Sequence, residues 1–127
     1  MTHRWAWAVP LFGGVLLLTA LQVGAADIVV APDGDDAGGQ GTQAAPYRTA
    51  QRAQEAVRAL LAAEPGRARP IVVALRGGFY PLGQTLVFRP EDSGTERVPV
   101  HWTAWPGEEP VLSGGVRIRG WEVVDGR

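Results

Sequence analysis

Acidic side chains are the first candidates for chemistry in this sequence, because a glycosidic bond is cleaved by two carboxyl groups held about 5 to 10 Å apart across a cleft. Two adjacent pairs occur, Glu91 with Asp92 and Glu108 with Glu109. Neighbouring side chains on an extended chain point to opposite sides. We therefore interpret both pairs as turn or surface acids and assign no catalytic residue.

A third acidic group, Asp33, Asp35 and Asp36, lies among glycines. Clustered carboxylates on a flexible loop suit calcium. The spacing does not fit the twelve-residue calcium loop, whose last position is an acid and here is Ala44. Asp and Gly are also the usual residues of turns, so we predict a solvated turn, with no metal and no cofactor.

His101 and three tryptophans complete the candidates. His101 alternates with Val100 and Trp102 in a strand pattern, and a general base needs a partner within hydrogen-bond reach, so we interpret it as a surface residue. Trp102, Trp105 and Trp121 could stack on sugar rings, but Trp in short strands more often packs in the core. We favour the core for all three.

The amino terminus has the pattern of an export signal. A short polar head precedes an apolar stretch at 5–21, and small residues follow up to Ala26. This pattern predicts a signal peptide at 1–26 and a secreted or periplasmic protein. The alternative is an uncleaved anchor, but the stretch is shorter than the about 20 residues of a membrane span and is broken by Pro10. We expect no stable span after cleavage.

Composition limits what the remaining residues, 27–127, can be. They suffice for one small domain of about 100 residues. The 127-residue sequence contains no cysteine, so no disulfide can stabilise an exported domain. The net charge is −1 and the basic residues are scattered, which argues against nucleic acid as a partner.

One helix and several short strands must position these residues. Thr49 can cap a helix that ends before Pro65, and Ala50, Val57 and Leu60 fall on one face of it. A continuous apolar strand follows at 71–75. Turn residues separate the other strands that we predict, at 28–31, 79–80, 85–88, 98–104, 110–112, 116–118 and 121–124.

This order of elements has two physical solutions. The strands could pair antiparallel in a small sandwich or barrel, or they could stack in parallel as coils of a solenoid. A stacked solenoid needs a cap over its first coil. The single early helix can serve as that cap and therefore favours the solenoid.

Several motifs resemble a known family. The sequence D-D-A-G-G-Q-G-T, then A-P-Y-R-T, an Ala-rich helix, I-V-V-A-L-R-G-G-F-Y, D-S-G-T, W-P-G-E-E-P-V-L-S-G-G and G-W is similar to the amino-terminal part of secreted right-handed parallel β-helix proteins. These are pectate-lyase-like carbohydrate enzymes and include glycoside hydrolases. The similarity covers about residues 28–121.

The resemblance implies a mainly β fold, a right-handed parallel β-helix of which this chain carries the cap helix and first coils. Family members are several hundred residues long and place their catalytic residues on later coils. We therefore expect residues 27–127 to be the amino-terminal part of an exported glycoside hydrolase or polysaccharide lyase, truncated before its catalytic coils, with polysaccharide as its partner. The alternative is a noncatalytic glycan- or protein-binding β module. Neither choice determines an oligomeric state.

Overall fold

The computed structural model describes residues 25–122. The predicted signal peptide lies almost entirely outside these residues. Within them, no helix is both long enough and apolar enough to cross a bilayer.

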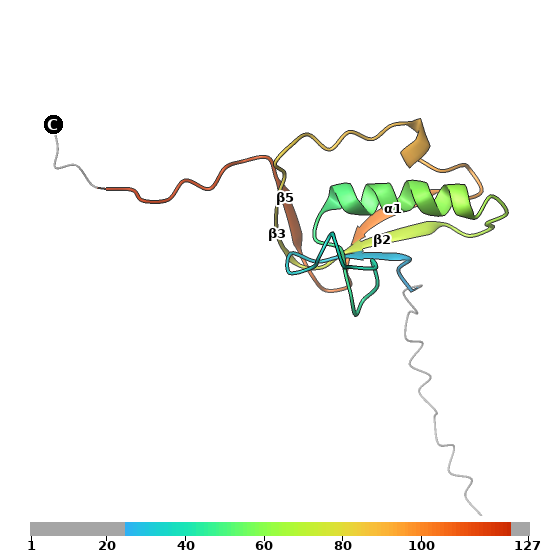
Figure 1. Ribbon diagram of the computed structural model, residues 1–127, viewed down its shortest axis with the longest axis horizontal. Helices are drawn as coiled ribbons and strands as arrows, with labels where there is room; N and C mark the ends of the chain where they lie inside the picture. Colours follow the sequence, from blue (N-terminus) through green and yellow to red (C-terminus); the bar gives the residue numbers. More distant parts are fainter. Residues whose placement is uncertain (1–24, 123–127) are drawn as a thin grey trace, which may run out of the picture.

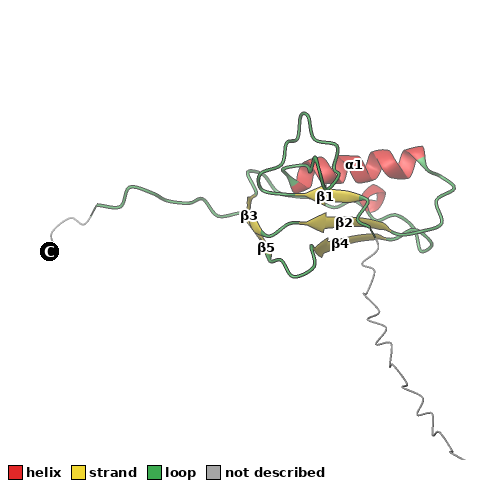
Figure 2. Ribbon diagram, turned by 90° about the horizontal axis from the view of Figure 1, so that it is seen from below, coloured by secondary structure: helices red, strands yellow, loops and turns green. Residues whose placement is uncertain are grey.

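The strands form two parallel sheets. β1 (Ile28–Val30), β2 (Ile71–Leu75) and β4 (Val100–Ala104) lie side by side in the order β1-β2-β4, and β3 (Gly78–Pro81) pairs with β5 (Pro110–Ser113) (Figure 2). Every pair of named strands in residues 25–122 is parallel. The antiparallel sandwich or barrel that the sequence left open is therefore wrong for these strands.

Equivalent strands stack in register. Ile28, Val73 and Trp102 form one row across the three-stranded sheet. The chain passes from β2 to β3 and again from β4 to β5, so the second passage lies directly on the first. Because side chains alternate between the faces of a strand, one face of the sheet collects the apolar residues of the core, among them Ile28, Val30, Ile71, Val73 and Leu75.

Helix α1 (Ala50–Ala63) packs against this core (Figure 1). The Thr49 side chain accepts the Arg52 N–H at 3.2 Å, which confirms the predicted cap. Ala50 and Val57 are buried, whereas Leu60 is only half-buried against the core. The predicted apolar face is thus correct.

The loop at residues 32–48, here the cap loop, covers the outer edge of β1. Val29 N–H donates to Gly41 O at 2.7 Å, and Tyr47 N–H donates to Val29 O at 3.0 Å. A bridge between Val30 and Tyr47 continues the pairing. The loop therefore occupies hydrogen-bonding groups that another strand would otherwise use.

The opposite edge, at β4, is open. Trp105 N–H donates to Leu75 O at 2.7 Å, and alternate residues of a parallel strand donate to opposite neighbours. The amides of Val100, Trp102 and Ala104 therefore point toward an edge that no strand in residues 25–122 covers.

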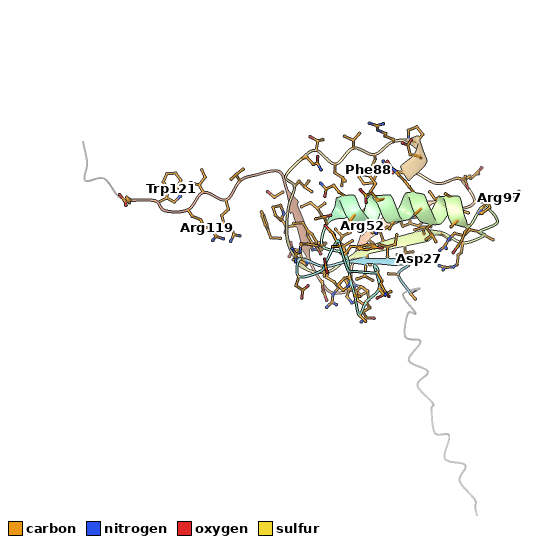
Figure 3. The ribbon with its side chains drawn as sticks, in the orientation of Figure 1. Asp27, Arg52, Phe88, Arg97, Arg119 and Trp121 are labelled. Atoms are coloured by element: carbon orange, nitrogen blue, oxygen red, sulfur yellow. The ribbon has the colours of Figure 1, made fainter. Side chains whose placement is uncertain are left out.

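Three predicted strands are absent or different. Residues 85–88 are irregular and lead into a short 3-10 helix, η1 (Pro90–Asp92). Residues 116–118 and 121–122 form no strand and lie on an extended segment that leaves the body, where Figure 3 places Arg119 and Trp121. These residues have β-forming sequence, but within the described chain they have no strand to pair with, and a strand without a partner is not stable.

Candidate functional site

A hollow of about 590 Å³ lies at the carboxyl ends of the parallel strands. Asp33 follows β1, Arg76 follows β2 and Glu108 follows β4. Carboxyl ends of parallel strands meet at one edge of a sheet, which is where open parallel sheets commonly bind ligands. The residues that line the hollow include Asp33, Gln43, Arg76, Gly77, Phe79 and Glu108.

Arg76 and Glu108 form one wall of the hollow. Arg76 Nε lies 2.9 Å from both Glu108 carboxylate oxygens, Arg76 Nη2 lies 2.8 Å from Oε1, and Gly77 N–H donates to Oε2 at 2.6 Å. The hydrogen bond from Arg76 and then that from Gly77 hold the pKa of Glu108 below its usual value. Glu108 is therefore ionised at neutral pH and has no proton to give as a general acid.

Further contacts hold the side chain and the backbone of Arg76 in place. The Arg76 guanidinium lies over the Trp105 ring, 5.2 Å from its centroid. The Tyr80 hydroxyl donates to Arg76 O at 2.7 Å and lies 3.1 Å from Val30 O. Burial raises the pKa of Tyr80 to about 12, so the phenol stays neutral. Arg76 is thus held at its side chain and at its backbone.

The other wall is exposed and polar. Asp33 and Gln43 on the cap loop are both exposed. Between the walls, the Phe79 ring is 40% exposed. Gly78 has a φ of +132°, and a Cβ there would lie 2.7 Å from Pro32 Cγ, so only glycine lets the chain turn at this point. The arrangement offers hydrogen-bonding groups around an aromatic ring, which is a binding surface and not a catalytic pair.

The remaining acids of the cap loop serve the protein's own backbone. Asp36 accepts hydrogen bonds from Arg48 N–H at 2.7 Å, Thr49 N–H at 3.0 Å and the Thr49 hydroxyl at 2.7 Å. Asp36 therefore lies in a turn, as predicted, but its half-buried carboxylate also orients the start of α1. Asp35 accepts from Ala37 N–H at 2.9 Å. Residues 25–122 contain no group of three or more His, Cys, Asp or Glu side chains placed to hold a metal ion.

The two members of each adjacent acid pair differ in burial and in their contacts. Glu91 is exposed, but Asp92 is only 2% exposed and is bound by Arg58, so its prediction as a surface acid is wrong. Glu109 is exposed, while Glu108 turns to Arg76. No side-chain hydrogen bond joins the members of either pair in the described structure.

The histidine and the tryptophans do not come together. His101 is exposed, as predicted for a surface residue. Trp102 packs against the core and meets Phe88 edge-on at 5.3 Å. Trp105 lies under Arg76 and outside the core cluster, and Trp121 is 80% exposed, so the prediction of a core position is wrong for both. The three indoles therefore form no common stacking platform.

Two ionic contacts had no signal in the sequence. Arg76 and Glu108 are far apart in the chain and join only because the turns after β2 and β4 stack. Asp27 accepts hydrogen bonds from Arg67, Arg69 and Val72 N–H. Burial raises the pKa of Asp27, but these hydrogen bonds outweigh burial and lower it overall. Pairings of this kind follow from the fold and cannot be read from spacing.

Comparison with known proteins shows a similarity to a solved structure. No family model matches the chain, and no curated protein matches it. A solved structure described as "Glycoside hydrolase" is 36% identical, with a TM-score of 0.72. The match covers 80% of this chain and 17% of that structure's chain, so this chain spans less than a fifth of its relative's length.

Proposed function

We propose that this chain is the amino-terminal cap and first coils of an exported right-handed parallel β-helix protein that acts on polysaccharide. The observation that carries the proposal is the match to a glycoside hydrolase at 36% identity over 80% of this chain. The small share of the relative that is matched, 17%, supports the view that the catalytic coils lie outside this chain.

The strand arrangement supports the same proposal. The parallel, in-register pairing of β2 with β4 and of β3 with β5 is the pairing that two successive coils require. The cap loop covers the β1 edge, while no strand in residues 25–122 covers the β4 edge, where another coil could pair. Glu108 is ionised and bound to Arg76, so it has no proton to give as a general acid, and on this proposal the catalytic residues lie on later coils.

A noncatalytic module that binds glycan or protein is the second candidate. The observation that favours it is the set of polar groups that line the hollow. These groups can bind a ligand, and Glu108, the carboxyl group of the Arg76 wall, has no proton to donate. On this hypothesis the described segment binds its partner without any further coil.

The experiment is to sequence the coding DNA beyond Arg127, express the complete reading frame and incubate the secreted product with a panel of plant and bacterial polysaccharides. New reducing ends without unsaturated products would indicate a hydrolase, and unsaturated products would indicate a lyase. A frame that ends at Arg127, with a folded product that binds glycan and cleaves none, would replace the enzyme by the binding module.

A further inference from the structure

We propose that the hollow bounded by Asp33, Gln43, Phe79 and Arg76 binds a neutral sugar residue of the polysaccharide. The ligand is an uncharged pyranose unit, and not a uronate, a sulfated sugar or a metal ion. This inference rests on the proposed function for the choice of a glycan and goes beyond it by naming a site and a ligand charge.

The size of the hollow fits such a ligand. Its volume of about 590 Å³ lies within the range of about 300 to 1,000 Å³ found for small-molecule sites. Gly77 and Gly78 form part of the lining, so the backbone there carries no side chain that would fill the space. A sugar ring can therefore approach the main chain closely.

The hydrogen-bonding groups fit vicinal hydroxyls. The Asp33 carboxylate can accept two hydrogen bonds, and the Gln43 amide can both accept and donate. Both side chains are exposed on the same wall, and among the described residues Asp33 makes no side-chain hydrogen bond that a ligand would have to break. Planar groups of this kind match the spacing of adjacent sugar hydroxyls.

The apolar side of a sugar ring also has a surface to meet. Phe79 lines the hollow beside the polar wall; the Arg117 guanidinium lies over its ring, 5.5 Å from the centroid, and with that contact in place Phe79 is still 40% exposed. Pyranose rings carry C–H groups on one face, and an aromatic ring is the usual side chain on which such an amphipathic ligand rests.

The charged groups around the hollow favour no anionic ligand. Arg76 and Glu108 neutralise one another through their paired contacts, Asp33 adds one negative charge, and Arg117 over the Phe79 ring adds one positive charge. A uronate carboxylate would therefore meet no net positive charge to offset the loss of its hydration. A metal ion is also disfavoured, because the described residues provide no group of three possible ligands.

The test measures glycan binding by the full-length exported protein, using isothermal titration calorimetry with cellohexaose, xylohexaose, mannohexaose and hexagalacturonate. We expect at least one neutral hexasaccharide to bind more tightly than hexagalacturonate. Asp33→Ala should weaken binding of that neutral sugar about tenfold, the change expected for losing hydrogen bonds to a charged group. Gln43→Ala should weaken it several-fold.

Two further variants sharpen the result. Asp33→Asn keeps an acceptor oxygen and removes the charge. It should therefore retain most of the affinity for the neutral sugar and reduce the difference in affinity between the neutral hexasaccharide and hexagalacturonate. Glu55→Ala removes an exposed acid on α1, outside the hollow, and should leave the affinities for neutral and acidic sugars unchanged. Melting temperatures of all variants should match, because the three substituted side chains are exposed.

Failure of this inference is distinct from failure of the proposed function. If the protein cleaves polysaccharide but binds neutral sugars equally well with Asp33→Ala and Gln43→Ala, the hollow is not a sugar site and the function stands. If hexagalacturonate binds more tightly than every neutral hexasaccharide, the proposal of an uncharged ligand is wrong. If no glycan is bound or cleaved, both proposals are overturned.

Discussion

Arg58 on α1 binds the buried carboxylate of Asp92, which lies 34 residues further along the chain, through both Nε and Nη2, with an Nη2–Oδ2 distance of 2.9 Å. Gln54 Nε2 donates to the same carboxylate at 2.9 Å, and Arg89 N–H donates at 2.7 Å. Asp92 is 2% exposed. The carboxylate therefore fastens the segment after β3 to the helix that caps the sheet.

This contact predicts an acid-dependent loss of stability. The hydrogen bond from Arg58 is the main cause of the lowered pKa of Asp92 in the folded protein. The unfolded state takes up a proton at about pH 4, before the folded state does, so the stabilisation is complete above that pH and is lost as the pH falls through the folded pKa. Urea denaturation at several pH values should show a constant free energy of unfolding near neutrality and a decline below about pH 4.

Asp92→Asn provides the control for this prediction. Every partner of Asp92 is a hydrogen-bond donor, so the amide nitrogen would face donors. We expect a loss of about 1 to 3 kcal/mol at neutral pH, limited because Arg58 is 38% exposed and can be hydrated. The free energy of unfolding of the variant should also fall less steeply below about pH 4 than that of the parent. A pH dependence identical to that of the parent would contradict the role of Asp92.

Leu60→Asp should destabilise the helix cap. Leu60 packs against the core from α1, so an aspartate there loses apolar burial and brings a charge toward the sheet. We expect a cost of about 2 kcal/mol in the free energy of unfolding. Ala59→Asp is the matched control, because Ala59 is exposed on the same turn. Equal melting temperatures for the two variants would count against the packing of α1 on the sheet.

Three glycine substitutions separate backbone strain from steric conflict. Gly94 has a φ of +69°, and an added Cβ would lie 2.1 Å from Val98 O; Gly107 has a φ of +76° and open space around it. Gly107→Ala should cost about 1 to 2 kcal/mol for the left-handed backbone, and Gly94→Ala should cost more. Gly66→Ala, without either feature, should be neutral or slightly stabilising. If thermal denaturation ranks the stabilities of the three variants in another order, this assignment of strain and steric conflict is wrong.

The open strand edges predict self-association of residues 27–127 when they are produced alone. β5 exposes Leu112, and the segment after it exposes Val116 and Trp121. Lysine on an edge strand blocks such pairing, so Leu112→Lys should lower the association measured by sedimentation. Ala59→Lys adds the same charge on α1 and should leave it unchanged. A parent protein that stays monomeric at high concentration would refute the prediction.

The local elements were predictable because their causes are local. Thr49 and Pro65 mark the limits of a helix, and the structure has α1 at Ala50–Ala63. The apolar run at 71–75 is β2. Residues 85–88 have equally good strand character, yet they form no strand. Strand formation needs a neighbouring strand, and that depends on where the chain goes next.

The hollow was not predictable, since its residues come from turns that meet only after the strands stack. Arg76 and Glu108 carry no pattern that joins them, and the acidic, glycine-rich pattern around Asp33 predicts only a solvated turn. Asp92 was misjudged because its burial depends on Arg58 of α1. The motifs predicted a similarity to carbohydrate enzymes, among them glycoside hydrolases, and a solved structure described as "Glycoside hydrolase" does match at 36% identity, whereas the β-helix fold stays a prediction.

The cap loop gives strand stacking a direction. At β1 the loop uses the outer backbone groups, through Val29 with Gly41 and Tyr47, whereas no strand in residues 25–122 pairs with the outward amides of β4. A template with one blocked end can be extended only from the other. Synthesis also runs from the amino terminus, so on the proposed function a strand made after this segment would find an unpaired edge at β4 alone, and the cap loop would keep it from pairing at β1.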